Sequence, residues 1–438
     1  MKLILKFLLS LTLVAMMVSV VQAAPPTPLW SDHVGTNDVA LSKDGNYVAV
    51  ASGNQLRFYG RSSGTPLWES TSPGGPVESV AISADGDCVV AGTQLPSGGY
   101  IAFWRNARSL TGNPTPTWSS VDLTGPVTKR CLDISDDGNY VVACGTGQYV
   151  FYWANAKTRS TTPELFSWRS PNLGSAHAVD LSSDGNYVAT GGNQYVAYWK
   201  NAKPLTGNPQ NPDWKSTTPT DLIVDIAISD DGNYVAAAGR AGYSPVYYWA
   251  NAKSLSGDPS TTWDSAAGVE FDSLDMSSDG DSVIAGGMDP PADMGVYFWA
   301  GARGLSGTPN PTWVYPTQVG IHDVAINDAG DYMAAVQSLA VPHRAYFFNR
   351  AGGLMWSFDL ETPSLVVSIS GDGATLAIGT SEANTAYLLS TGYRTYGPPV
   401  GGVVMPTNKL EILAPYLALA GLVTAVSTVV VVKNRREE

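Results

Sequence analysis

A four-residue turn recurs eight times along the chain and constrains the fold more than any other feature. Each copy ends in Gly, usually after Asp, and apolar, β-branched runs such as VALS and YVAVA flank it. Asp-Gly supplies the side-chain acceptor and the positive φ that a tight hairpin turn requires, so every copy predicts two antiparallel strands. The copies lie at residues 42–45, 83–86, 135–138, 182–185, 229–232, 277–280, 327–330 and 370–373.

Two further strand patterns follow each hairpin. The third run ends in aromatic residues, as in VFYWANA and VAYWKNA, and the fourth centres on one tryptophan, as in PTWSS and PDWKS. The fourth run follows only seven of the hairpins, but PLWSD, with Trp30, stands ahead of the first. This offset predicts an N-terminal strand that completes the last sheet. The repeat region is therefore expected to be all-β and to form an eight-bladed β-propeller closed by an N-terminal strand.

The ring explains how these sheets bury their residues. A single four-stranded sheet with apolar residues on both faces exposes them, whereas stacked blades cover one another and leave only short outer edges. All 13 tryptophans fall within the repeats, which predicts that they pack between blades. An open solenoid is the alternative, but it leaves the Trp30 strand without a role.

The repeat resembles WD40-like and YVTN-type β-propeller proteins over about residues 25–392, through its S-x-D-G hairpin followed by Y-V-A. The longer W-x-N-A-K-x-L-x-G-x-P module, as in WKNAKPLTGNPQNPDW, and the apolar C-terminal run with its basic end look like archaeal envelope-anchored propeller proteins. The chain lacks the Gly-His dipeptide of strict WD40 repeats, so the resemblance implies the fold rather than an intracellular scaffold role.

The N-terminus has the pattern of a secretory signal. Lys2 and Lys6 precede an apolar run that ends in small residues near Ala23, so residues 1–23 are expected to be a signal peptide. A retained N-terminal anchor is the alternative. The mature chain would then begin with the propeller ectodomain at residues 25–392.

The C-terminus has the pattern of a membrane anchor. Residues 412–432 carry no charge and precede Lys433, so residues 410–432 are expected to form one transmembrane helix, with 433–438 as a cytoplasmic basic tail. A buried core helix is the alternative. Residues 393–409 are rich in Gly and Pro and predict a stalk. The expected location is the cell membrane, single-pass, with the propeller outside.

Charge and cysteine content narrow the partners and the compartment. The formal net charge of −13 makes nucleic acid an unsuitable partner. Only three cysteines occur, so the chain is no disulfide scaffold. Cys131 and Cys144 flank the turn at Gly138 almost symmetrically. The sequence leaves open whether they form a disulfide or remain two free thiols. Cys88 is expected to be a buried small hydrophobe.

The repeat also separates two sides of the ring. With strands a to d in each blade, the a–b and c–d connections emerge on one side, called here the a–b side, and the b–c and d–a connections on the other, the b–c side. The b–c connections differ most between repeats, and loops on a rigid scaffold are a common place for binding. Lack of constraint is the alternative explanation. The candidate partner-binding loop residues are Gln94, Arg240, Tyr243, Met288, Asp293 and His343.

Residues that open strand a should crowd the mouth of the central channel on the b–c side. Imidazole and carboxylate groups together suit a cation or a polar ligand, although solvated loop residues are the alternative and no metal site is predicted. The candidate ligand-binding residues are Asn37, Glu78, Arg130, His177, Asp225, Asp272, His322 and Asp323. Deeper in strand a, Asp133, Asp180 and Asp275 either line the channel or cap neighbouring backbone.

No motif for catalysis accompanies this scaffold. The chain has no H-E-x-x-H, no G-x-x-x-x-G-K-[ST] and no adjacent cysteines of the quinoprotein kind, and we expect no cofactor. The favoured function is a membrane-anchored extracellular binding module for an envelope protein or glycan. One alternative is an extracytoplasmic enzyme or sensor, quinoprotein-like or metal-dependent, with its site at the channel mouth. Another is a structural cell-surface coat subunit.

Overall fold

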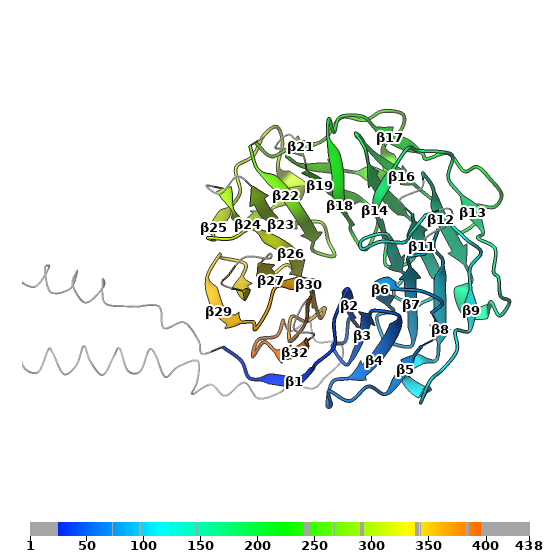
Figure 1. Cartoon of the computed structure of the whole chain (residues 1–438). Coiled ribbons are helices and arrows are strands. Elements are labelled where there is room, and N and C mark those ends of the chain that lie inside the picture. Colours follow the sequence, from blue (N-terminus) through cyan, green and yellow to red (C-terminus); the bar gives the residue numbers. More distant parts are fainter. Residues whose placement is uncertain are drawn as a thin grey trace, which may run out of the picture. The chain divides into compact units, whose positions relative to one another are not determined.

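Eight four-stranded antiparallel sheets surround a central axis in the computed structural model (Figure 1). The structure describes residues 25–395 except 72, 96–97, 124, 146–147, 241–244, 267, 290–292, 338–340, 342 and 382–384. The predicted all-β, eight-bladed propeller is confirmed. The predicted signal peptide, transmembrane helix and basic tail lie outside the described residues. Within the part that is described, no helix has the length and apolar character needed to span a membrane.

The sheets are called blades 1 to 8, with strand a next to the axis and strand d at the rim. Blades 1 to 4 comprise β2 (Asp38–Leu41), β3 (Tyr47–Ser52), β4 (Gln55–Gly60), β5 (Trp68–Ser70); β6 (Val77–Ile82), β7 (Cys88–Thr93), β8 (Ile101–Arg105), β9 (Trp118–Ser119); β10 (Leu132–Ile134), β11 (Tyr140–Cys144), β12 (Val150–Ala154), β13 (Trp168–Arg169); and β14 (Ala176–Leu181), β15 (Val188–Gly192), β16 (Tyr195–Trp199), β17 (Trp214–Ser216).

Blades 5 to 8 follow the same order, except that the last strand of blade 8 comes from the N-terminus. They comprise β18 (Leu222–Ile228), β19 (Tyr234–Arg240), β20 (Val246–Ala250), β21 (Trp263–Asp264); β22 (Glu270–Met276), β23 (Ser282–Asp289), β24 (Gly295–Ala300), β25 (Trp313–Pro316); β26 (Ile321–Ile326), β27 (Tyr332–Gln337), β28 (Arg344–Asn349), β29 (Leu354–Asp359); and β30 (Ser364–Ile369), β31 (Thr375–Thr380), β32 (Ala386–Ser390), β1 (Pro28–Asp32).

The Ser-x-Asp-Gly turns join strands a and b, and blade 4 shows why each residue is needed. The Ser182 hydroxyl donates to Asp184 Oδ1 at 2.8 Å and accepts the backbone N–H of Tyr187 at 3.0 Å. Gly185 has a φ of +79°, and a Cβ there would lie 2.4 Å from the Tyr140 ring of blade 3. The glycine therefore serves both the turn and the close approach of two blades.

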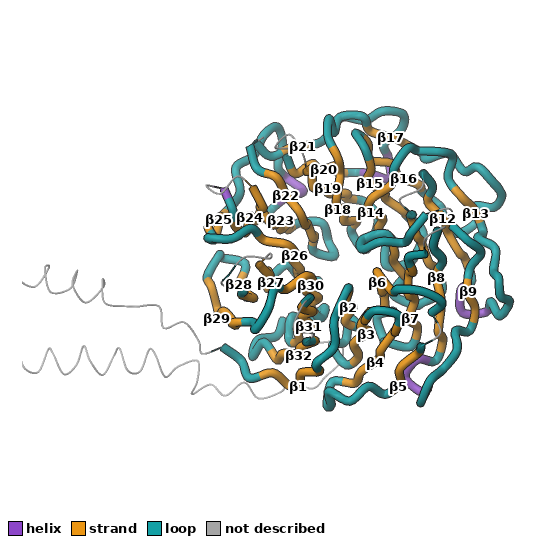
Figure 2. The backbone as a smooth tube through the Cα atoms, viewed as in Figure 1, coloured by secondary structure: helices purple, strands orange, loops and turns teal. Residues whose placement is uncertain are grey.

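The Asn-Ala-Lys module forms the c–d connection and joins neighbouring blades. Its Asn adopts the left-handed conformation, as at Asn251 (φ +58°), and a short 3₁₀ helix follows. These helices lie at the outer rim (Figure 2). Trp214 of blade 4 donates its indole N–H to the carbonyl of Ala252 in blade 5 at 3.0 Å. The described residues contain η1 (Ala107–Ser109), η2 (Ala156–Thr158), η3 (Ala252–Ser254) and η5 (Ala302–Gly304), and Gly301 takes the place of the Asn before η5.

The N-terminal strand closes the ring as the offset repeat predicted. β1 pairs antiparallel with β32, and Trp30 lies opposite Leu388. Trp30 is 7% exposed and stacks on Tyr59 of blade 1 at 4.8 Å between ring centroids. Within the described residues its indole nitrogen has no hydrogen-bond partner, whereas the tryptophans of the other seven outer strands donate to a carbonyl of the following blade. Pairing of the two chain ends excludes the open solenoid.

Candidate functional site: the two ends of the central channel

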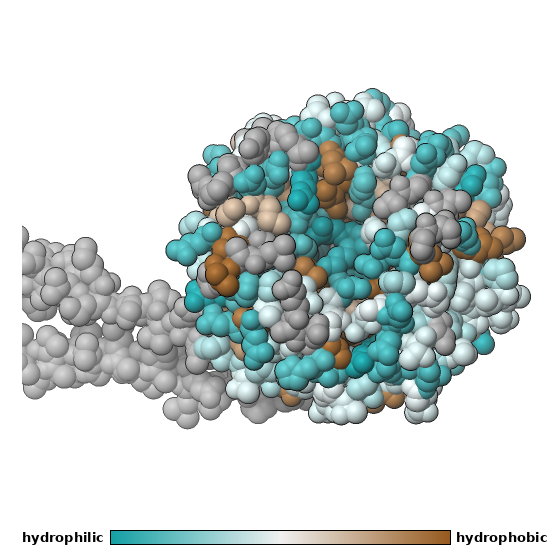
Figure 3. Space-filling model, in the orientation of Figure 1, coloured by the Kyte–Doolittle hydropathy of each residue, from teal (hydrophilic) through white to brown (hydrophobic). Residues whose placement is uncertain are grey.

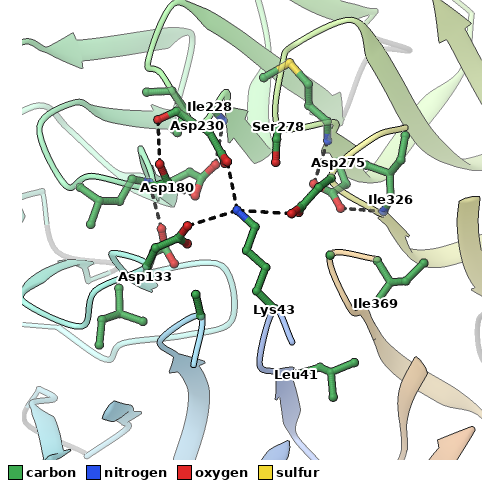
Figure 4. A pocket seen from close by; sticks show the side chains of 18 of the residues that line it. Leu41, Lys43, Asp133, Asp180, Ile228, Asp230, Asp275, Ser278, Ile326 and Ile369 are labelled. Carbon is green, nitrogen blue, oxygen red and sulfur yellow. Dashed lines mark hydrogen bonds and ion pairs between the residues drawn. The ribbon is translucent and has the colours of Figure 1, made fainter. Parts of the chain in front are cut away.

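A single lysine closes the a–b end of the channel. Lys43, in the first turn, places its Nζ 3.2 Å from Asp136, 3.0 Å from Asp230 and 3.6 Å from Asp328, which come from blades 3, 5 and 7 (Figure 4). Burial alone would lower the pKa of Lys43, but the three carboxylates outweigh it and raise the pKa above its ordinary value. The lysine therefore stays charged and ties four blades together across the axis.

Backbone hydrogen bonds form a second ring at the same end. Turns of neighbouring blades are joined in sequence, for example by Ala84 N–H to Asp136 O at 3.0 Å and by Asp230 N–H to Ser278 O at 2.9 Å. Gly371 of blade 8 donates to Lys43 O of blade 1 at 2.8 Å and completes the circle. This end of the channel is therefore built as a scaffold rather than as an open entrance.

A cavity of ≈ 260 Å³ lies behind Lys43, and three aspartates of strand a line it. Each accepts a backbone N–H from strand a of the next blade: Asp133 from Leu181 at 3.0 Å, Asp180 from Ile228 at 2.7 Å, and Asp275 from Ile326 at 2.8 Å. They both line the channel and cap neighbouring backbone, so the two expectations for them hold together. Their role is to join the inner edges of adjacent blades.

Burial changes the acidity of these aspartates. It raises the pKa of Asp275 to about 8, although the backbone N–H groups of Ile326 and Met276 act in the opposite direction. Burial also raises the pKa of Asp133 well above its ordinary value, and the neighbouring Asp180 raises it further. The carboxyl groups of Asp133 and Asp180 share a side-chain hydrogen bond, which requires a proton on one of the two. The channel interior carries less negative charge than its carboxyl groups suggest.

An arginine closes the b–c end. Arg130 Nε lies 3.1 Å from Asp225, its Nη2 lies 3.4 Å from Asp323, and Nη2 also donates to the carbonyl of His322 at 3.3 Å. The backbone of Arg130 has a φ of +62°, which non-glycine residues seldom adopt. The side chain therefore spans the mouth from blade 3 to blades 5 and 7 and is held there through Nε and Nη2.

The two aspartates that hold Arg130 also join blades. Asp225 accepts the backbone N–H of Leu274, and Asp323 accepts that of Val367, both at 2.9 Å. Burial raises the pKa of Asp225 to about 7, and Arg130 opposes the shift. These side chains are therefore structural as well as candidate ligand contacts.

A second charged group lies beside Arg130. Asp272, 4% exposed, pairs with Arg240 at 2.9 Å, and His322 Nε2 lies 3.8 Å from the same carboxylate. Burial lowers the pKa of His322, and its Nδ1 is buried without a hydrogen-bond partner in the described part of the chain. The imidazole is thus neutral near pH 7, which leaves it able to accept or donate one further hydrogen bond.

The structure brings five of the eight predicted mouth residues into this cluster and separates the other three. The cluster comprises Arg130, Asp225, Asp272, His322 and Asp323. Asn37 instead donates its amide to Val77 O at 2.8 Å, which joins blades 1 and 2. Glu78 is half-buried at the start of β6, and His177 is half-buried in β14, where burial lowers its pKa.

The predicted loop residues are scattered around the b–c side. Arg240 reaches the mouth cluster through Asp272. Gln94 is exposed and donates its backbone N–H to Pro76. The carbonyl of Asp293 accepts the Tyr297 hydroxyl, and the carbonyl of His343 accepts the Leu360 N–H. Met288 lies near the end of β23, and Tyr243 lies outside the described residues.

A disulfide joins Cys131 and Cys144, whose Cα atoms lie 4.7 Å apart. It links the residue before β10, which follows Arg130 in the chain, to the last residue of β11, and both cysteines are fully buried. Cys88 is free and buried. The bond ties the residue next to the strained Arg130 backbone to its neighbouring strand.

Two lysines that the repeat analysis passed over shape the channel. Lys43 is the single basic residue among the eight equivalent turn positions, and three of the others are Asp. This pattern of charges in the sequence could have indicated the ion pairs across the axis. Lys129 precedes Arg130; burial lowers its pKa, and the charge on Asp38 opposes that shift. Among the described residues, no group of three or more His, Cys, Asp or Glu side chains is placed to hold a metal ion.

Comparison with solved structures shows the same fold. The C-terminal WD40 domain of Sif2 superposes with a TM-score of 0.64 and 13% sequence identity, covering 84% of this chain and 99% of that domain. A chain of a mitotic checkpoint complex superposes with a TM-score of 0.54 and 15% identity, covering 85% of this chain and 96% of the other. No family model and no curated protein sequence matches the chain. The fold is therefore a WD40-type β-propeller.

Proposed function

We propose that the protein is a membrane-anchored, extracellular binding module that engages a protein of the cell envelope through the b–c side of its propeller. The observation that carries the proposal is the contrast between the two sides. Repeated turns, a closed ring of hydrogen bonds and Lys43 occupy the a–b side, whereas the connections at Gln94, Arg240, Met288 and Gln337 differ from blade to blade. Divergent loops on a rigid support are typical of recognition surfaces.

The position of the chain end agrees with this orientation. Thr395 donates its backbone N–H to Asp372 O at 2.8 Å and its hydroxyl to Asp331 at 3.3 Å, and both aspartates belong to a–b turns. Pro28, in the first strand, lies opposite Leu389 near the same side. Both ends of the described chain therefore leave the b–c side free.

The disulfide supports the proposed compartment. Disulfides persist mainly outside the cytoplasm, and the signal-like residues 1–23 and the uncharged residues 412–432 suit a secreted and anchored chain. The engaged state of Arg130 argues for recognition by the b–c loops around the mouth, since a small ligand at the mouth must compete with Asp225 and Asp323.

The test replaces the four divergent b–c connections with the short Gly192-Asn193 turn of blade 4. The full chain in detergent is immobilised and exposed to a detergent extract of the native envelope, and the retained proteins are quantified. We expect the shortened variant to lose a specific retained protein while its unfolding transition is unchanged. Equal retention by both proteins would contradict the proposal.

A further inference from the structure

The seam between blades 6 and 7 lacks a covering loop that the earlier seams have. A seam is here the contact between strand d of one blade and the c–d connection of the next. In the five seams from blade 1 to blade 6, that connection hydrogen-bonds to the outer edge of strand d. The bonds are Glu69 N–H to Gly112 O, Val121 N–H to Glu164 O, Gln210 N–H to Arg169 O, Lys215 N–H to Gly257 O and Asp264 N–H to Gly307 O, at 2.9–3.2 Å.

The cause is the length of the connection. In blade 6, residues 301–312 join strands c and d, whereas in blade 7 only residues 350–353 do so. The short connection supplies Arg350 O to the Trp313 indole at 3.1 Å and reaches no further along β25. Val314 occupies the position of Lys215 and Asp264, and within the described residues no acceptor beyond the strand ladder faces its backbone N–H.

The tryptophan at this seam is more exposed than its counterparts in the other blades. Twelve of the thirteen tryptophans are buried, and Trp313 is the exception. Val314 beside it is 42% exposed. Hydrophobic surface (brown) is visible between the outer strands β25 and β29 in Figure 3. Apolar and backbone groups that the loop covers elsewhere are therefore open to solvent here.

A cavity of ≈ 270 Å³ continues the seam toward the b–c side. Tyr315, Tyr346, Arg344 and Gln337 line it. Gln337 is 1% exposed, and its Oε1 has no hydrogen-bond partner among the described residues, which is costly for a buried polar atom. The amide oxygen thus marks a place where a hydrogen-bond donor from a bound molecule would be favourable.

We propose that this seam docks an extended, glycine- and proline-containing peptide segment of a partner protein, in the way that the L-x-G-x-P loops cover the earlier seams. The inference rests on the proposed function, because it takes the partner to be a protein. A carbonyl of the segment accepts the Val314 N–H, as Gly257 O accepts that of Lys215. A hydroxyl or amide group of the segment donates to Gln337 Oε1. Trp313 and Tyr315 pack against the apolar part.

The chain supplies its own probe. The peptide ARGLSGTPNPTW, residues 302–313, contains the loop that covers the seam between blades 5 and 6. The fluorescein-labelled peptide is titrated into the full chain in detergent, and binding is followed by anisotropy. We expect saturable binding that weakens by about tenfold in Val314→Pro, which removes the outward N–H, and by about threefold in Gln337→Leu. No saturable binding to the unchanged protein would overturn the proposal.

A graft provides the matched control. Replacing residues 350–353 with the sequence of residues 301–312 should cover the seam within the chain and abolish peptide binding, and unchanged binding to the graft would overturn the proposal. A photocross-linker at position 314 should label the added peptide. Labelling of this chain's own residues 396–409, or of a second copy, would show that the chain itself occupies the seam and that the proposal is wrong. Peptide binding that fails while loop-dependent envelope capture persists would leave the proposed function standing.

Discussion

The a–b and b–c sides of this propeller use charge and backbone differently. On the a–b side, one lysine neutralises carboxylates from three blades and a closed ring of backbone hydrogen bonds joins all eight turns. On the b–c side, Arg130 and Arg240 form a cluster with four acidic and imidazole side chains, and the surrounding loops follow no common pattern. The repeated turn sequences are the ones that hold the scaffold together. Loops that depart from the repeat are therefore the better candidates for recognition.

The largest expected effect is on the a–b side, from Gly185→Ala. The new Cβ would require a strained φ and would lie 2.4 Å from the Tyr140 ring, so we expect a loss of about 2–4 kcal/mol in the free energy of unfolding. Gly174→Ala on the b–c side is the matched control, because its φ is +93° but nothing lies within 4 Å. Denaturant unfolding of both variants measures the contrast, and equal losses would refute it.

Lys43→Met should have the next largest effect. It leaves Asp136, Asp230 and Asp328 facing one another without a cation, and because these groups are partly solvated we expect a loss of about 1–2 kcal/mol. Adding Asp230→Asn to this variant should recover part of the loss, since it removes one of the repelling charges. A double variant no more stable than Lys43→Met would show that repulsion is not the cause. Denaturant unfolding in low salt provides both values.

The pH dependence of stability comes next. Asp38, Asp225 and Asp275 have pKa values raised to about 6, about 7 and about 8 by burial, so the folded state holds their protons more tightly than the unfolded state does. Their stabilising contribution is complete below about pH 4 and is lost progressively as the pH rises from about 4 to the folded-state pKa of each group, about 6, 7 and 8. The free energy of unfolding should therefore fall over this range. In Asp275→Asn the decrease in the free energy of unfolding should be smaller by at least about 1.4 kcal/mol, the equivalent of one pKa unit. An unchanged slope would contradict the raised pKa of Asp275.

The smallest effect on stability should come from the b–c loops. Shortening the connection that begins at Gln94 to a two-residue turn removes the backbone hydrogen bonds from Gln94 to Pro76 and from Leu123 to Gly99, so we expect a loss of no more than about 1 kcal/mol. Thermal unfolding of the single-loop variant measures it. A loss as large as that of Gly185→Ala would show that the loops are part of the scaffold and would remove the distinction between the sides.

The fold was predictable because its signals are local and repeated. The Asp-Gly turns, the single Trp of each outer strand and the displaced Trp30 strand predicted the number of blades and the closure. Register also followed, since one alignment of the repeat places every strand a. The pairing of Cys131 with Cys144 was left open by the sequence, because spacing around a turn allows the bond without requiring it.

The candidate site was less predictable, because side-chain direction and partners come from blades distant in sequence. Asn37 was expected at the mouth but turns to Val77, whereas Arg240, expected in a loop, reaches Asp272 in the next blade. Lys43 pairs across the axis with residues up to 285 positions away, a relation that no local pattern contains. The open seam at Val314 was also hidden, since it depends on the length of a connection in the following blade.

Site-directed blocking of one side tests the central claim most directly. Gln94 on the b–c side and Asn46 on an a–b turn are both exposed, and the native free thiol, Cys88, is buried. Gln94→Cys and Asn46→Cys in the full chain would each be coupled to a maleimide polymer and tested for retention of native envelope protein. The account predicts that the polymer at position 94 abolishes retention and that the polymer at position 46 leaves it unchanged. Loss from position 46 alone would contradict it.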